Sequence, residues 1–555
     1  MPKRKYSTNK KVRQIRTIES SEKEDHVQAV FIPNPDDSGE SDCDSSHSDE
    51  SDLSTDNDSD VDCFDFQQFQ SFRKVSELYN ANQNKLEDGH TYHWIDGETE
   101  YNDDLSNDIL LSEADKKNIL ACSPTDLFEM FFSKSLKKHI LDATSEHGYD
   151  LASNRLDTFL GVIIFTIFNK RLSQRDYWST NPLMRSDPVV AAMGRREFEK
   201  IKSCIKYHRL DDENANDKIW RVRRIMDIFN ENIKRFGFFC SALCVDEMML
   251  KFYGQISFKQ FIKSKPIRFG IKQWALCSSN GYLFHCQIYC GKNDKDDFLP
   301  NCAQGSRVVM QMLQKFLTDT SPRNILKYHI YFDNLFCCPD LLVHLKKLNL
   351  RATGTVRKNR IEVSNDIDAK SPKGTSKGKY DQNSGINFVT VIDSKPVSIL
   401  STAAGITPVS NVKRYNKEVK EKVTINFPNA FKIYNKFMGG VDLHDQHCNK
   451  LAPIVRSKKW TWVIFIRLLQ AAITNATVLY NSANEKGKNL GTKDFALKIS
   501  EQYLNSKKTT NNKHNLETTV HKRNCSKKHC NARTYKSCKE CKAYFCIKCF
   551  QETHD

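Results

Sequence analysis

The hydrophobic pattern of this chain changes near residue 240, and that change limits the folds open to it. Upstream, from about residue 113, apolar residues recur at helical spacing, as in Phe198, Ile201 and Ile205. Downstream, short apolar runs rich in β-branched and aromatic residues take over, with helical stretches between the later runs. Strands and helices mixed in this order predict an α/β core that follows a helical segment.

Polar stretches divide the chain further. Residues 359 to about 386 are rich in Lys, Ser and Gly and lead into two strand-like runs, which predicts a β-rich insertion into the α/β core. Helical patterns return after the insertion and continue to residues 484–520, whose polar character indicates a linker. Seven units are predicted: a tail (1–112), a helical segment (113–242), the first half of the core (243–358), the insertion (359–427), the second half of the core (428–453), a second helical segment with its linker (454–520), and a Cys/His-rich module (521–555).

The N-terminal tail shows no sustained apolar periodicity. A basic start with Lys3, Arg4 and Lys5 precedes an acidic, serine-rich run from Asp36 to Asp62. Low hydrophobicity combined with high charge predicts disorder over residues 1–112. No apolar stretch of the kind found in secretory signals follows the basic start, which is a candidate nuclear import signal.

The charge of the chain points to a polyanionic partner. Its formal net charge is +16, from 84 Lys and Arg against 68 Asp and Glu. The run from Asp36 to Asp62 holds twelve acidic and no basic residues, so the rest of the chain carries +16 + 12 = +28. A body this basic favours nucleic acid as the partner, and a merely soluble, lysine-rich surface is the alternative.

Two other features narrow the class of protein. The most apolar run, Phe159–Phe168, has ten residues, about half the length of a membrane span, so it predicts a buried helix and no membrane partner. The chain has 19 cysteines and no secretory signal. This combination predicts a reducing compartment in which thiolates bind metal instead of forming disulfides.

Three acids stand in unusual settings. Asp246 follows the apolar run SALCV, and Asp333 follows the run HIYF. Asp442 lies at the start of a predicted helix in GGVDLHDQ, with Asp445 one turn later. An acid in an apolar strand is unfavourable unless it is paired or bound to metal. Gathered together, such acids would form the all-oxygen site that two Mg²⁺ ions need for phosphoryl transfer; taken singly, each is a cap or turn residue.

The last 35 residues are rich in metal ligands. The candidates are Cys525, His529, Cys530, Cys538, Cys541, Cys546, Cys549 and His554. Eight ligands suit two tetrahedral Zn²⁺ ions. So short a segment has no room for a core of its own, so metal binding would supply its folding energy. His521 and His529 both remain candidates beside the first cysteine pair, which is separated by four residues.

Seven strings of this chain resemble, in the same order, those of piggyBac family transposases: VDEMM, KPIRFGIKQW, GYLFHCQIYCGKN, YFDNLF, ATGTVRKNR, YNKFMGGVDLHDQ and RSKKW. The resemblance covers about residues 113–555. It implies a ribonuclease-H-like catalytic core interrupted by an insertion, flanking α-helical segments that bind DNA and dimerise, and a zinc cross-brace module at the C-terminus.

The resemblance also implies roles for particular residues. The family's three catalytic aspartates fall on Asp246, Asp333 and Asp442, and its further functional acid falls on Asp445. Trp460 matches a family tryptophan near the tip of a DNA hairpin, where an indole can stack on an unstacked base; a core tryptophan is the alternative. The basic residues assigned to DNA binding are Lys458, Lys459, Arg357, Lys358 and Arg360.

These observations lead to one interpretation with two rivals. The chain is interpreted as a nuclear, Mg²⁺-dependent transposase that cuts double-stranded DNA at transposon ends, joins it at TTAA targets, and acts as a homodimer or larger assembly. The first rival is a domesticated, non-catalytic DNA-binding regulator of chromatin. The second is a protein-interaction factor that acts through a RING- or PHD-like zinc module, with the α/β body as a scaffold.

Overall fold

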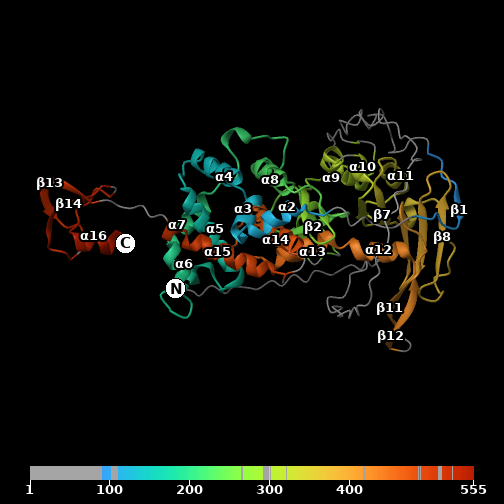
Figure 1. The fold of residues 1–555 in the computed structure, drawn as a ribbon. Coiled ribbons are helices and arrows are strands. Elements are labelled where there is room, and N and C mark those ends of the chain that lie inside the picture. Colours follow the sequence, from blue (N-terminus) through green and yellow to red (C-terminus); the bar gives the residue numbers. More distant parts are fainter. Residues whose placement is uncertain are drawn as a thin grey trace, which may run out of the picture. The chain divides into compact units, whose positions relative to one another are not determined.

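The structure is a computed structural model of the chain (Figure 1). It describes residues 90–101, 110–263, 265, 267–291, 299, 302–320, 322–416, 420–484, 487, 489–509, 516–527, 529–539 and 541–554. The predicted disorder and the candidate nuclear import signal of the tail fall mostly on residues 1–89 and 102–109, which lie outside this description.

A helical segment precedes the sheet. It contains α2 (Glu113–Ala121), α3 (Pro124–Phe131), α4 (Lys134–Glu146), α5 (Ser153–Phe168), η3 (Gln174–Trp178), α6 (Asp187–Ala192), α7 (Arg195–Cys204), η4 (Leu210–Asp212) and α8 (Trp220–Ile233). Ser123 caps α3 and forms a capping box with Asp126, as its sequence predicts. Helix α5 is apolar on nearly all sides and buried, so the ten-residue apolar run belongs to a core helix.

The core is a ten-stranded sheet. Its strands are β1 (Trp94–Asp96), β2 (Ala242–Lys251), β3 (Lys259–Phe261), β4 (Phe269–Ser278), β5 (Leu283–Ile288), β6 (His329–Phe332), β7 (Arg351–Thr355), β8 (Ser376–Asp381), β9 (Asn387–Ile392) and β10 (Pro396–Ser401). The order is β1-β8-β9-β10-β7-β6-β2-β4-β3, and β5 also pairs with β4. Strands β2, β4 and β5 are antiparallel neighbours, whereas β2, β6 and β7 run parallel.

Helices connect the parallel strands, as expected for crossovers. Helices α9 (Gln304–Asp319) and α10 (Pro322–Ile325) precede β6, α11 (Pro339–Lys347) joins β6 to β7, and η5 (Lys358–Arg360) follows β7. The indole of Trp274 in β4 packs edge-on against Phe336, which lies in the loop between β6 and α11.

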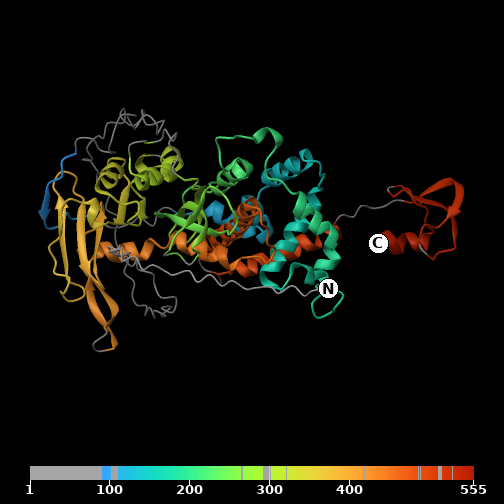
Figure 2. The same ribbon diagram turned by 180° about the vertical axis from the view of Figure 1, so that it is seen from behind.

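The predicted insertion continues the core sheet instead of forming a separate one. Its strand β10 pairs antiparallel with β7, and β9 and β8 extend the same sheet outward. Figure 2 shows these strands from behind, in yellow and orange, next to the green core strands. A separate two-stranded ribbon, β11 (Ser410–Asn416) and β12 (Glu421–Phe427), completes the insertion.

The prediction of disorder up to residue 112 is wrong for residues 90–101. Strand β1 pairs with β8 at the edge of the sheet. The buried carboxylate of Asp381 accepts a hydrogen bond from the backbone N–H of His93 and contacts the ring of His90 at 3.0 Å. A three-residue strand is too short to show a period in the sequence, which is why the tail pattern concealed it.

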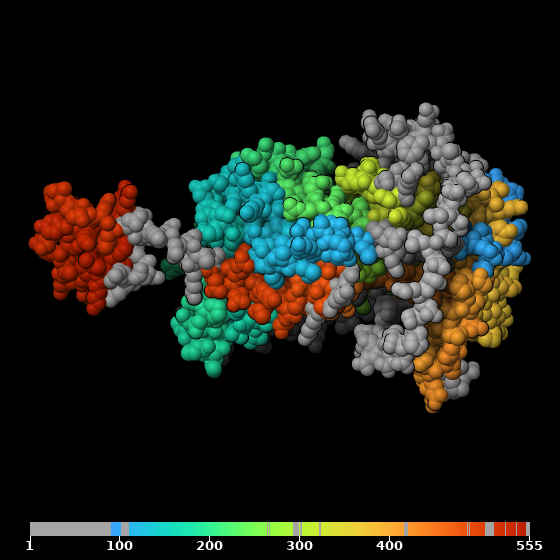
Figure 3. All heavy atoms as spheres, in the orientation of Figure 1, coloured from blue at the N-terminus to red at the C-terminus, as the bar shows by residue number. Residues whose placement is uncertain are grey.

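Helices return after the insertion: α12 (Asn429–Phe437), α13 (Gly440–Lys450), α14 (Trp460–Ala483) and α15 (Thr492–Thr509). Helix α14 is long and apolar enough to cross a membrane, with mean hydropathy 1.5, but 89% of its apolar window is buried inside the protein. It is therefore a core helix. In Figure 3 the blue α2 region lies directly against orange-red segments from the C-terminal half, in agreement with the packing of α14 on α2.

The prediction of a linker over residues 484–520 is also partly wrong. Helix α15 packs along α5, and its side chains Phe495, Ile499 and Tyr503 are buried. Gly161 of α5 allows this close approach, because a Cβ there would lie 2.7 Å from the Cβ of Tyr503. The final module contains β13 (Leu516–Asn524), β14 (Arg533–Cys538) and α16 (Ile547–His554).

Candidate metal-binding sites

Two of the predicted acids lie side by side near the middle of the sheet. Asp246 is on β2, whose Val245 pairs in parallel register with Phe332, the last residue of β6. Asp333 follows Phe332 directly, so the two acids occupy equivalent positions on adjacent strands, whose backbones lie about 4.8 Å apart. The Asp246 residue is only 8% exposed.

The third acid comes from α13, which starts directly on the sheet. A Cβ on Gly440, the first helical residue, would lie 2.1 Å from the carbonyl oxygen of Ser278, so only glycine fits there. The thiol of Cys244, on the same face of β2 as Asp246, donates a 2.7 Å hydrogen bond to the last carbonyl of α12. These contacts fix the helix start against β2 and place Asp442 in its first turn.

Burial and nearby negative charge disfavour the charged forms of all three acids. Burial raises the pKa of Asp246 well above its ordinary value, and the nearby carboxylates of Glu247, Asp333 and Asp442 add to the effect. Burial, with Glu247, raises the pKa of Asp333 to about 6. The pKa of Asp442 is raised too, first by the protein atoms around its carboxylate and then by Asp445 and Glu247, although the residue as a whole is exposed. Such a group is stabilised by a bound cation.

Two lysines and one further acid join this cluster. The ammonium nitrogens of Lys265 and Lys272 each lie 3.7 Å from a carboxylate oxygen of Glu247. Burial alone would lower the pKa of Lys265, but Asp246 and Glu247 raise it. Sequence reasoning missed these three residues. The available signals were the position of Glu247 next to Asp246 and two lysines in the string KPIRFGIKQW.

Asp445 faces a different partner. Its Oδ1 lies 2.9 Å from Nη2 of Arg467, and its Oδ2 accepts a 3.1 Å hydrogen bond from Asn449. Arg467 belongs to the core helix α14 and is 5% exposed. The carboxylate of Asp445 is thus engaged in tying α13 to α14, one turn beyond Asp442.

The basic residues after β7 hold the loop that carries Asp333. Arg357 donates a 2.8 Å hydrogen bond to the side chain of Asn334. Arg360 donates to the carbonyl of Leu335 at 2.8 Å. Lys358 is exposed. A DNA-binding role for all three stays a prediction, with an added structural role for the two arginines.

The residues around the start of α14 lie at the surface. Trp460 is half-buried and packs edge-on against Phe258, with ring centroids 5.3 Å apart. Lys458 is exposed, and the ammonium of Lys459 donates to the carbonyl of Ser203 at 3.0 Å. The indole is therefore neither fully buried in the core nor free, and its stacking on DNA stays a prediction.

Four cysteines of the C-terminal module form a cluster. The sulfurs of Cys525, Cys530, Cys546 and Cys549 all lie within 4.8 Å of one another. The Cys530–Cys546 sulfur separation is 3.9 Å. Zn–S bonds of about 2.3 Å in a tetrahedron would place sulfurs about 3.8 Å apart, so this cluster has the dimensions of a tetrahedral metal site.

Among the predicted ligands whose side chains the structure describes, the others do not join this group. Cys538 and Cys541 form a second pair, in which the backbone N–H of Cys541 donates to the Cys538 sulfur at 3.4 Å. His529 has a positive φ of 69° and is not in the four-thiolate cluster within the described residues of the module. The His554 side chain lies outside the description.

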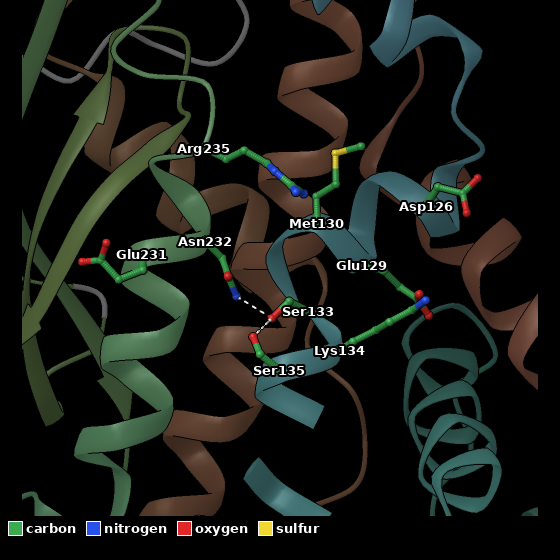
Figure 4. Close-up of a pocket in the computed structure, with 9 residues that line it drawn as sticks. All are labelled: Asp126, Glu129, Met130, Ser133, Lys134, Ser135, Glu231, Asn232 and Arg235. Carbon is green, nitrogen blue, oxygen red and sulfur yellow. Dashed lines mark hydrogen bonds between the residues drawn. The ribbon is translucent and has the colours of Figure 1, made fainter. Parts of the chain in front are cut away.

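A pocket of about 500 Å³ lies elsewhere, between α3, α4 and α8. Figure 4 shows its lining, in which Asn232 donates to Ser133 and both acidic and basic side chains face the space: Asp126, Glu129, Met130, Ser133, Lys134, Ser135, Glu231, Asn232 and Arg235. None of the clustered acids of the sheet lines it, so the pocket is separate from the candidate metal site.

Comparison with known proteins identifies the fold and its relatives. The family model described as Transposase IS4 matches residues 123–477. Human PiggyBac transposable element-derived protein 3 is 31% identical over 376 residues, which cover 66% of this chain and 62% of the relative. Human PiggyBac transposable element-derived protein 2 is 29% identical over 372 residues, 64% of this chain and 61% of the relative. The chain thus spans somewhat over three fifths of these relatives.

A solved structure shares the fold. A cryo-EM structure of the piggyBac transposase synaptic complex with hairpin DNA aligns with a TM-score of 0.57 and 20% sequence identity. The alignment covers 70% of this chain and 82% of that one.

Proposed function

The chain belongs to the piggyBac family of transposases, and we propose from this premise that it is a metal-dependent enzyme that cuts and joins DNA strands. The observation that carries the proposal is the meeting of Asp246, Asp333 and Asp442. They come from three segments far apart in sequence, and the register of β2 with β6 and the close seating of α13 bring them together.

The donor set fits Mg²⁺. All three side chains offer carboxylate oxygens, the ligands that Mg²⁺ prefers. Their raised pKa values reflect burial first and neighbouring negative charge second, and a bound cation would favour the charged forms. Two bound Mg²⁺ ions would activate a water or 3′-hydroxyl and stabilise the leaving oxygen.

The chain's own residues prepare this chemistry. The backbone N–H of Leu335 donates to Asp333 at 2.8 Å and orients its carboxylate. Lys265 carries positive charge close to the acids and is placed to neutralise a phosphate that approaches them. Asp445 acts through Arg467, by keeping α13 and therefore Asp442 in position.

We assign the five strands β5-β4-β2-β6-β7 to a ribonuclease-H-like core. The antiparallel group of three strands followed by two parallel strands supports this assignment. On this view β8 to β12 form the insertion, which enlarges the core sheet at the β7 edge.

The C-terminal module is proposed to bind zinc. The four clustered thiolates fit one ion, and Cys538 with Cys541 would supply half of a second site, completed by His554 together with His529 or His521. The module would read the transposon end, since Lys522, Arg523 and Arg533 are exposed on it.

The partner is proposed to be double-stranded DNA, with TTAA as the target and a homodimer or larger assembly as the active form, in the nucleus. The net charge of +28 outside the acidic run supports the DNA partner. The piggyBac structure with hairpin DNA supports it by similarity of fold.

Strand cleavage tests the proposal. Duplex DNA that carries the element's own ends should be cut by the wild-type chain in Mg²⁺, and Asp246→Asn should abolish cutting while end binding persists, because no phosphate-contacting group is lost. End binding without any Mg²⁺-dependent cleavage by the wild type would instead favour a non-catalytic DNA-binding regulator. Absence of DNA binding at physiological salt would favour a protein-interaction factor.

A further inference from the structure

Three exposed aromatic side chains lie on or near the hairpin of β3 and β4, two on its paired strands and one in the loop between β2 and β3. Tyr253, Phe261 and Phe269 are 71%, 56% and 45% exposed. Phe261 and Phe269 are paired across the two strands, and their ring centroids lie 4.7 Å apart. These three residues are called the aromatic hairpin surface below. Isolated exposed aromatics are common, but Phe261 and Phe269 contact each other, and a contiguous exposed apolar group indicates a binding site.

The two phenylalanines lie on the same face of the sheet as Asp246. Asp246 pairs with Ala275 of β4, and paired residues share a face. Phe269 is six residues from Ala275, an even number, so it lies on that face, and Phe261 opposite it does too. Six residues of antiparallel strand span about 20 Å. The aromatic pair therefore stands within about 20 Å of the catalytic acids.

The same stretch is strongly basic. Residues 248–269 contain no Asp or Glu, and their five cationic side chains are Lys251, Lys259, Lys263, Lys265 and Arg268. Lys251 lies over the ring of Tyr253, 5.4 Å from its centroid. Lys263 and Arg268 are exposed at the hairpin tip. Aromatic faces interleaved with cations are complementary to nucleic acid bases and phosphates.

The hairpin is held in place by the protein. Phe258, 3% exposed, packs edge-on against Trp460 at the start of α14. The ammonium of Lys259 donates to the carbonyl of Gly254 at 3.0 Å, and the N–H of Ile262 donates to the carbonyl of Arg268 at 2.9 Å. The surface is thus formed before a partner arrives.

We propose that the aromatic hairpin surface binds an unpaired DNA strand beside the cut site, with bases stacked on Phe261 and Phe269 and phosphates near Lys263 and Arg268. The inference rests on the proposed function, because it places this strand relative to the acids. At the duplex rise of about 3.4 Å per nucleotide a span of about 20 Å corresponds to roughly six nucleotides, and a more extended unpaired strand covers it with fewer.

Base fluorescence tests this surface. The full chain carrying Asp246→Asn, which prevents cleavage, is mixed with a duplex that has a single-stranded extension containing 2-aminopurine at successive positions. Stacking on the phenylalanines should quench the 2-aminopurine fluorescence at a position within about six nucleotides of the junction between duplex and extension. Phe261→Ala should weaken binding of the extension by roughly five-fold or more, since stacking contributes about 1–3 kcal/mol per base.

Two matched substitutions separate stacking from apolar packing. Phe261→Trp should restore quenching and affinity, whereas Phe261→Leu should behave like Phe261→Ala because it lacks an aromatic face. The salt dependence of binding should stay unchanged in all three, since no charge is altered.

Wild-type affinity and quenching in Phe261→Ala would overturn the proposal, and so would wild-type affinity and quenching in Phe261→Leu. Loss of self-association in Phe261→Ala with unchanged DNA binding would also overturn it, because the surface would then bind a second copy of this chain. These failures are distinct from failure of the proposed function. If the wild-type chain cuts DNA and Phe261→Ala binds the extension normally, only the proposed role of the aromatic hairpin surface is rejected. If the wild-type chain never cuts DNA but Phe261→Ala binds the extension more weakly, only the proposed catalysis is rejected.

Discussion

The acid cluster of the sheet and the cysteine cluster of the C-terminal module both have the chemistry of metal sites, but the protein builds them in opposite ways. The acids are held by a sheet, by hydrogen bonds and by close packing of α13, and each of these contacts joins protein atoms only. The module's buried core consists of Cys525, Cys538, Phe545 and Cys549, and three of these four are cysteines.

We therefore propose that the fold of the sheet brings the charged acids together, whereas bound metal stabilises the fold of the module. Bringing like charges together is unfavourable, so the sheet must be stable enough to withstand the mutual repulsion of Asp246, Asp333 and Asp442. A segment of about 35 residues cannot bury enough apolar surface to fold alone, so its ligands must supply the stability.

The largest expected effect comes from breaking the cysteine cluster. Cys546→Ser should unfold the module, because structural zinc contributes on the order of 10 kcal/mol to such folds. Zinc content should fall and residues 516–550 should become sensitive to protease, while the urea unfolding of the sheet stays unchanged. Cys204→Ser, in α7 outside the module, is the control. A protease-resistant module in Cys546→Ser would contradict the role of metal in its folding.

A smaller effect should separate the scaffold of the acid site from its metal ligands. Asp445→Asn leaves Arg467 buried without its partner charge, so the free energy of unfolding should fall by about 3 kcal/mol. Arg467→Met removes the buried charge itself, and the half-exposed Asp445 can then be solvated, so the loss should be smaller. Urea unfolding at pH 7 measures both. Equal losses, or a larger one for Arg467→Met, would argue against this asymmetry.

The smallest expected effect is a pH dependence of the metal-free sheet. Asp333 has its pKa raised from 3.8 to about 6 in the folded protein. Between these values the folded state binds more protons than the unfolded state, so stability falls as pH rises from about 4 through about 6 and is level above. The contribution is at most about 3 kcal/mol, at 1.36 kcal/mol per pKa unit. Asp333→Asn should remove the share of this slope that Asp333 contributes and leave the share of Asp246 and Asp442, whose pKa values are also raised, and saturating Mg²⁺ should reduce all three. An unchanged slope in Asp333→Asn would assign the pH dependence entirely to other groups.

Much of the acid site could be predicted because its signals are local. Asp246 and Asp333 each end an apolar run that forms a buried strand, and Asp442 follows two glycines at a helix start. Whether these acids lie close together depends on strand register. The sequence does not contain the pairing of Val245 with Phe332, so proximity of the acids had to come from the resemblance to a family.

The features that escaped prediction depend on partners distant in sequence. Arg467 looked like one polar position in an apolar helix, and only the fold shows that Asp445 compensates it. Helix α15 buries Phe495, Ile499 and Tyr503 at a spacing of four, with the small residues Ala496 and Ser500 beside them, and this pattern was present in the sequence but sparse among polar residues. Nothing in the sequence marked β1, because its pairing with β8 joins segments almost three hundred residues apart.

Hydrogen exchange of the full chain with and without metal tests the central contrast most directly. Backbone amides of β2, β6 and α13 should keep the same protection after all divalent metal has been removed by a chelator, because the sheet holds the acids by itself. Amides of residues 516–550 should lose their protection under the same treatment and regain it when Zn²⁺ is added back. Loss of protection in β2 and β6 on metal removal, or full protection of the module without metal, would contradict this contrast.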